Sequence, residues 1–130
     1  MTPYKPINEV IVPEQPVQNT STLINFCLAI RDFEGKPGDL NYKNNNPGNL
    51  RSNSGPFMKF TTYEEGFRAL MDYVIRVRDG NHKAYPKNPT IRRFFSIYAP
   101  SADNNNPLLY AQTVAKKVGL SIDDTLSKLT

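Results

Sequence analysis

One glutamate in the sequence stands where a general acid would be expected. Glu34 shares one face of a predicted helix over 21–34 with apolar residues at helical spacing, Leu23, Cys27 and Ile30. The Gly- and Pro-rich residues that follow end this helix. Both the helix dipole and partial burial disfavour a charged carboxylate at a helix C-terminus. A carboxyl group that keeps its proton suits general acid catalysis near neutral pH. A solvated terminal glutamate is the alternative that spacing alone leaves open.

A second group of polar residues follows in the long connection 35–61. The run Asn-Asn-Asn-Pro-Gly-Asn-Leu-Arg over 44–51 combines amides, a turn and a guanidinium. Amide side chains both donate and accept hydrogen bonds, which suits the hydroxyl and N-acetyl groups of sugars. An Asn-rich turn that satisfies its own backbone is the alternative.

The length of this connection is itself informative. Compact domains seldom carry such a long segment between two helices unless it is functional or disordered. Residues 57–61 follow a turn at 53–56 and are predicted to pair as a small β-ribbon. A long Asn/Gly/Pro loop or small ribbon beside a helix end predicts one wall of a cleft.

The remaining segments predict a mainly α domain over 21–130. Capping residues mark the starts of further helices, at the capping box 62–65, after Thr90, at Asn106-Pro107 and, for a short last helix, after Ser121. Too few segments alternate between apolar and polar residues for a β-rich domain. Residues 1–20 contain prolines that fix the backbone and remove donors, so they are expected to form an extended arm. A disordered leader and an attachment strand to a larger assembly are both compatible with it.

Composition narrows the classes of protein. The 130 residues are 38 % hydrophobic and 22 % charged, which suits one folded domain and excludes a disordered polyelectrolyte. No apolar run is long enough to predict a membrane span, and no secretory signal is expected. The net charge of +4 suits an anionic partner. The basic residues are spread along the chain, so no specific nucleic acid is expected.

Cofactor chemistry has few candidates in this sequence. Cys27 is the single cysteine and His82 the single histidine, too few for an internal disulfide or a zinc site. Neither a Walker loop nor a dinucleotide-binding glycine motif occurs. We therefore expect no cofactor and no metal.

Several motifs together resemble a known family. They are Glu34-Gly35 at a helix end, the Asn-Asn-Pro-Gly-Asn-Leu-Arg motif over 45–51, Phe60-Thr61-Thr62, 65–70, 97–100, Asn105-Asn106, Tyr110 and Val114. In this order they resemble the lysozyme-like domains of bacteriophage structural and lysis proteins, and the resemblance covers roughly 21–130.

The resemblance implies a small lysozyme-like helical fold that cleaves the β-1,4 glycan of bacterial peptidoglycan, between N-acetylmuramic acid and N-acetylglucosamine. Glu34 would be the general acid that protonates the glycosidic oxygen. The resemblance assigns the cleft wall, as substrate contacts or as residues that position the acid, to Asn46, Asn49 and Arg51. Candidates for stacking on sugars or bonding to the glutamate are Tyr63, Tyr98 and Tyr110, with core packing as the alternative role of each.

The sequence departs from this family at two positions. Many phage muramidases carry an aspartate and a threonine where this chain has Lys43 and Asn49. A two-carboxylate hydrolase needs a second acid. Asp39 is the nearest downstream candidate, and Asp32 is too close to Glu34 along the helix. We therefore expect single-glutamate chemistry, in which Glu34 acts as acid and then as base and the C6 hydroxyl of muramic acid attacks to give a 1,6-anhydro product.

These expectations predict a peptidoglycan-cleaving enzyme of phage origin, a lytic transglycosylase or a muramidase. It would be virion-associated, or cytoplasmic in the host before release, and would act on the cell wall. Other virion proteins are possible partners through 1–20. A non-catalytic virion protein that binds the wall or assembles in the particle is the alternative, and a nucleic-acid-binding module is a third hypothesis. Cleavage of the peptide cross-link also stays open.

Overall fold

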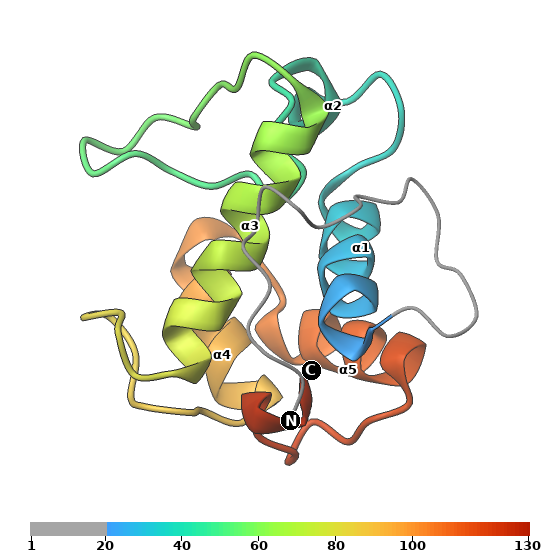
Figure 1. The fold of residues 1–130 in the computed structure, drawn as a ribbon, viewed down its shortest axis with the longest axis vertical. Coiled ribbons are helices and arrows are strands. Elements are labelled where there is room, and N and C mark those ends of the chain that lie inside the picture. Colours follow the sequence, from blue (N-terminus) through green and yellow to red (C-terminus); the bar gives the residue numbers. More distant parts are fainter. Residues whose placement is uncertain (1–20) are drawn as a thin grey trace.

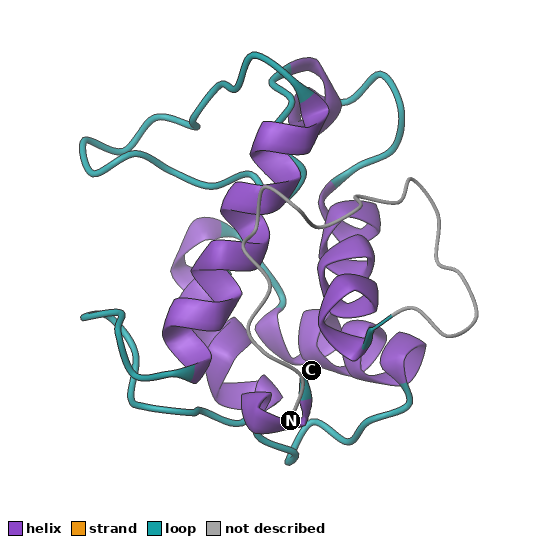
Figure 2. Cartoon of the chain, viewed as in Figure 1, coloured by secondary structure: helices purple, strands orange, loops and turns teal. Residues whose placement is uncertain are grey.

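The computed structural model describes residues 21–130, so the predicted arm over 1–20 lies outside the described residues. The described chain is mainly helical (Figures 1 and 2). Its α-helices are α1 (Thr22–Glu34), α2 (Leu40–Lys43), α3 (Tyr63–Arg78), α4 (Ile91–Tyr98) and α5 (Pro107–Val118), and its 3-10 helices are η2 (Ser101–Asp103) and η3 (Leu126–Lys128). No helix among the described residues is long and apolar enough to cross a membrane.

The predicted starts of the main helices are confirmed, because each is fixed by a local side-chain cap. The side chains of Ser21, Thr62, Thr90 and Asn106 each accept a backbone N–H from the first turn of α1, α3, α4 and α5. Gly119 ends α5 in the left-handed conformation, with φ 74°.

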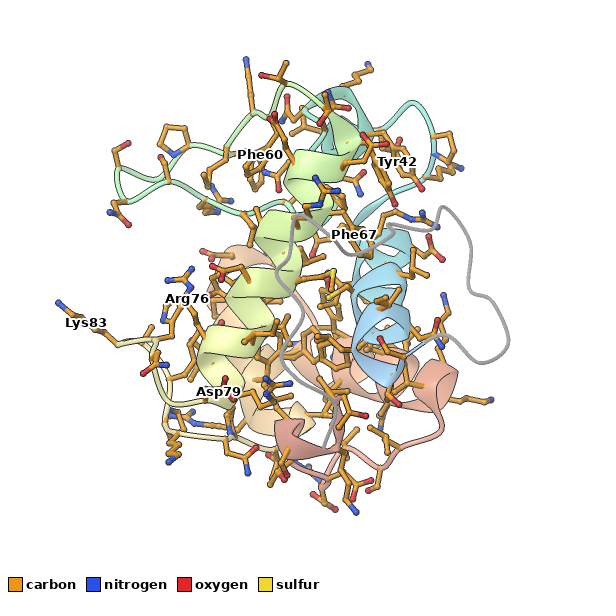
Figure 3. All side chains as sticks on the ribbon, in the orientation of Figure 1. Tyr42, Phe60, Phe67, Arg76, Asp79 and Lys83 are labelled. Atoms are coloured by element: carbon orange, nitrogen blue, oxygen red, sulfur yellow. The ribbon has the colours of Figure 1, made fainter. Side chains whose placement is uncertain are left out.

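The core lies where α1, α4 and α5 meet. α1 packs mainly against α5, and α4 packs against the same helix (Figure 1). Phe26 of α1 contacts Phe94 and Phe95 of α4 with ring centroids 5.8 Å apart, and all of these rings are fully buried. Edge-to-face aromatic packing adds to the stability that burial gives. Phe67 faces the interior between α3 and α1 (Figure 3).

The connection 35–61 differs from its prediction. It contains the short helix α2, and residues 21–130 hold no strand. The predicted ribbon is reduced to one antiparallel bridge between Arg51 and Phe57, extended by a bond from the Met58 N–H to the Leu50 carbonyl (2.8 Å). In Figure 1 this hairpin projects from the body beside the upper end of α3.

The predicted last helix after Ser121 is wrong. Backbone groups of this segment bond to the residues around the start of α4 instead: the Asp124 carbonyl accepts from Ile91 N–H, and the Leu126 N–H donates to the Pro89 carbonyl (2.9 and 3.0 Å). These bonds, and an antiparallel bridge between Thr90 and Thr125, take groups that a continuous helix would need. Only the 3-10 turn η3 remains helical.

Candidate functional site

A pocket of about 530 Å³ opens beside the C-terminus of α1, and Glu34 forms part of its wall. The rest of the wall comes from separate parts of the chain, namely 48–51, Asn53 and Phe57 of the hairpin, Tyr73 of α3, His82, and 97–100 with Asp103 and Asn105. The volume lies within the range typical of small-ligand sites. Both polar and aromatic side chains therefore face one space next to a carboxyl group.

Glu34 is half-buried, and both oxygens of its carboxylate accept hydrogen bonds. Asn49 Nδ2 donates to Oε1 at 2.8 Å, and the Tyr110 hydroxyl donates to Oε2 at 2.7 Å. One partner comes from the connection 35–61 and the other from α5. The two donors fix the direction of the carboxylate without neutralising it with a cation.

The position of Asn49 depends on the local fold of its loop. Its backbone has φ 49°, in the left-handed region that asparagine adopts more readily than most residues. Asn46 closes this loop from inside: its Nδ2 donates to the carbonyls of Leu50 and Met58, and its Oδ1 accepts the Leu50 N–H, all at 2.9 Å. Asn46 is fully buried and does not line the pocket. Asn46 therefore has the alternative role considered from the sequence, in which an Asn-rich turn satisfies its own backbone.

Close backbone approaches hold the loop against α1 and α3. A Cβ on Gly66 would lie 1.7 Å from the Asn45 carbonyl oxygen, so only glycine permits this contact with α3. On the other side, Asn41 Nδ2 donates to the carbonyls of Arg31 and Pro47 at 3.2 and 3.0 Å. The loop that carries Asn49 is thus fixed relative to the end of α1 that carries Glu34.

Tyr110 supports Glu34 from the core. Its ring stacks between Phe33 and Phe95, with centroids 3.9 and 4.3 Å away, and it is almost fully buried. Burial raises the pKa of Tyr110 well above its usual value, and the neighbouring Tyr98 and Glu34 raise it further. Its hydroxyl therefore keeps its proton and remains a donor to the carboxylate.

Tyr98 occupies the boundary between core and pocket. Tyr98 is one of the residues that line the pocket, while its hydroxyl donates to the Gly48 carbonyl. Burial of this hydroxyl, followed by the charge of Glu34, raises the Tyr98 pKa well above its usual value. The Tyr98 hydroxyl therefore keeps its proton and is already engaged with the loop.

The other two predicted residues differ in their placement. Arg51 lines the pocket, with its guanidinium 4.2 Å from the centroid of the Phe57 ring and a bond of 2.9 Å from Nη1 to the Gly55 carbonyl. Tyr63 does not line the pocket; its hydroxyl accepts from Nη1 of the buried Arg31 at 3.0 Å. A contact between Tyr63 and a ligand in this pocket is therefore not supported.

Three residues that the sequence analysis did not single out as site residues also line the pocket, namely Tyr73, His82 and Asp103. His82 packs edge-on against Tyr73 and Tyr85, with centroids 4.8 and 4.9 Å away. Burial, and then the positive charge of Arg76, lowers its pKa below 6.5. In Figure 3, Lys83, the next residue, extends away from the body. The uniqueness of His82 in the composition was the one available signal.

Among residues 21–130, no group of three or more histidine, cysteine or acidic side chains could hold a metal ion. Cys27 is buried among apolar residues, and this burial raises the pKa of its thiol far above the usual value. A buried neutral thiol is inert as a nucleophile. The ionisable chemistry of the pocket thus rests on oxygen and nitrogen groups.

Comparison with known proteins gives no further assignment: no protein-family model, curated protein or solved structure matches this chain.

Proposed function

We propose that this protein cleaves the β-1,4 glycan of bacterial peptidoglycan between N-acetylmuramic acid and N-acetylglucosamine, with Glu34 as the general acid. The observation that carries the proposal is the half-buried Glu34 carboxyl group, held by Asn49 and Tyr110 at the wall of a pocket. A fixed carboxyl beside a space large enough for sugar residues is what glycosidic cleavage requires.

The roles of the three residues follow from their hydrogen bonds. Protonated Glu34 gives its proton to the bridging glycosidic oxygen as the bond to C1 breaks. The carboxylate that results is stabilised by the donors Asn49 Nδ2 and Tyr110 OH, at 2.8 and 2.7 Å. Hydrogen bonds to a charged group are stronger than those between neutral groups. Both donors therefore favour the state that forms during cleavage.

The rest of the pocket suits a glycan. Two tyrosines, Tyr73 and Tyr98, and two asparagines, Asn53 and Asn105, are among the residues that line it. Aromatic faces pack on the C–H faces of sugars, and amides bond to their hydroxyl and N-acetyl groups. Arg51 and the net charge of +4 favour an anionic polymer such as the cell wall. We further propose a phage origin, with the protein in the virion or in the host before release.

The test is digestion of purified peptidoglycan by the wild type and by Glu34→Gln, with fragments identified by mass. Removing a general acid lowers the rate by about 100-fold or more, so the variant should release almost no glycan fragments. Glu64→Gln is the matched control, because Glu64 lies exposed in the first turn of α3 and does not line the pocket. It should cleave like the wild type.

Two results would contradict this function. Cleavage by Glu34→Gln at the wild-type rate would remove Glu34 from the chemistry, and release of peptides alone would indicate cross-link cleavage. Absence of any cleavage by the folded wild type, with binding to peptidoglycan intact, would instead favour the non-catalytic virion protein.

A further inference from the structure

The pocket contains a second carboxylate, which lies far from Glu34 in the sequence. Asp103 ends the 3-10 helix η2 in the connection between α4 and α5, and it is one of the residues that line the same pocket. It is exposed, and among the described residues its carboxylate makes no hydrogen bond or ion pair. An exposed carboxylate without a protein partner can accept a hydrogen bond from water at the pocket wall.

The backbone around Asp103 is held in place although its side chain is free. The Asp103 N–H donates to the Pro100 carbonyl at 3.1 Å, and Asn105 Nδ2 donates to the same oxygen at 3.3 Å. Asn104 then turns the chain in the left-handed region, with φ 63°. These bonds hold the backbone at Asp103 beside the pocket and leave its carboxylate oxygens available to water.

Other acidic residues of the described chain are engaged elsewhere. Asp32 pairs with Arg31 at 2.9 Å, and Asp39, the candidate nearest in the sequence, accepts the Lys36 N–H at 2.9 Å on the surface. Those beyond α2 that bond to other groups are Glu65, Asp72, Asp79, Asp123 and Asp124. Glu64 has no such bond, but it does not line the pocket. Asp103 is thus the one carboxylate besides Glu34 in the pocket wall among residues 21–130.

Other ionisable groups of the pocket are unsuited to accept a proton. His82 Nδ1 already accepts the Ala84 N–H at 3.2 Å, so a neutral His82 presents only its Nε2–H, which is a donor. The pKa values of Tyr73 and Tyr98 are raised by burial, so these hydroxyls stay protonated. Arg51 is a cation. Only Asp103 remains as a base.

We propose that Asp103 is the general base that activates water in the reaction of this pocket, so that cleavage is hydrolytic. This inference rests on the proposed function. Glu34 gives its proton to the leaving sugar oxygen as the C1–O bond breaks. Asp103 takes a proton from water, whose oxygen forms the new bond to C1. One water is added per bond cleaved, and proton exchange with solvent then restores both carboxyl groups.

This proposed mechanism differs from the single-glutamate chemistry expected from the sequence. Attack by the C6 hydroxyl gives a 1,6-anhydro end and needs no second carboxylate, whereas attack by water gives a reducing end and needs a base. In the pocket this base would be Asp103, which is exposed and therefore accessible to water. The two routes leave products that differ by the mass of one water.

The experiment compares glycan fragments from the wild type, Glu34→Gln, Asp103→Asn and the control Glu64→Gln. We expect reducing muramic ends from the wild type and from Glu64→Gln, and a loss of about 100-fold in Asp103→Asn. Azide needs no general base, so azide added to Asp103→Ala should restore cleavage. The product should be a glycosyl azide of inverted anomeric configuration. A purely structural role for Asp103 would not give this product.

The failures of the two proposals are distinguishable. If Glu34→Gln is inactive but the wild type yields 1,6-anhydro ends, or if Asp103→Asn cleaves at the control rate, the role of Asp103 is refuted and that of Glu34 stands. If Glu34→Gln cleaves normally, the proposed function itself is refuted.

Discussion

The hydrogen bond between Tyr110 and Glu34 allows a direct test of how the site is held. Tyr110→Phe removes the hydroxyl that donates to Oε2 at 2.7 Å. The ring should stay, because it is stacked between Phe33 and Phe95, with centroids 3.9 and 4.3 Å away. The substitution therefore removes one donor from the carboxylate and leaves the core volume unchanged.

The expected cost follows from the burial of the two partners. A hydrogen bond to a charged group contributes about 1.5–3 kcal/mol. Glu34 is half-buried and borders the pocket, so water can replace part of the lost bond. We therefore expect Tyr110→Phe to lower the free energy of unfolding by about 1.5–2 kcal/mol. In a Glu34→Ala background the hydroxyl has lost its acceptor, and the same change should cost about zero, since it removes a buried unpaired donor.

The assay is a double-mutant cycle at neutral pH, with the four free energies of unfolding measured by urea denaturation. The coupling between the two positions should be about 1.5–2 kcal/mol. Tyr85→Phe is the matched control: it removes a hydroxyl bonded to Tyr73 at 2.8 Å, and its cost should be the same with or without Glu34. Additivity of Tyr110→Phe and Glu34→Ala within about 0.5 kcal/mol would refute the bond as a support of the carboxylate.

Two further predictions concern the loop and the histidine. Gly66→Ala should destabilise the fold by about 2 kcal/mol in urea denaturation, because its Cβ would lie 1.7 Å from the Asn45 carbonyl oxygen. Helix propensity alone predicts that the same substitution stabilises the fold by about 1 kcal/mol, so a gain in stability would refute the contact. His82 has a pKa below 6.5 in the folded chain, so the unfolded chain binds more protons just below that pH and stability should fall as pH drops through 6.5. His82→Gln should lose this part of the pH dependence between pH 7.5 and 5.5, and an unchanged dependence would contradict it.

The starts of the main helices could be predicted from sequence because their signals are local. Ser21, Thr62, Thr90 and Asn106 each bond to a backbone N–H three residues ahead. The prediction of a last helix after Ser121 was wrong because the contacts that shape this segment are not local. Its backbone pairs with residues 89–92, and such contacts leave no periodic pattern near Ser121.

Prediction of the site was partial for a similar reason. The position of Glu34 at a helix end came from local spacing, and the motif over 44–51 does supply its partner Asn49. Within that motif, the direction of each side chain depends on backbone turns that the residue types do not specify. The Asn46 side chain therefore could not be placed from sequence, and in the structure it points into the loop. Asp103 lies between the motifs at 97–100 and 105–106 but belongs to neither, and it reaches the pocket of Glu34 only through the fold of the connection between α4 and α5.

The contacts of Glu34 also bear on when the site can exist during synthesis of the chain. Its partners lie 15 and 76 residues further along, in the loop and in α5. A domain emerges from the ribosome with its N-terminal part first. α1 is therefore made long before α5, the helix against which it mainly packs. A nascent chain that has not yet delivered Tyr110 has neither the buried surface nor the second donor that hold the carboxylate. The hydrogen-bonded arrangement around Glu34 can thus form only after the chain has been synthesised through α5.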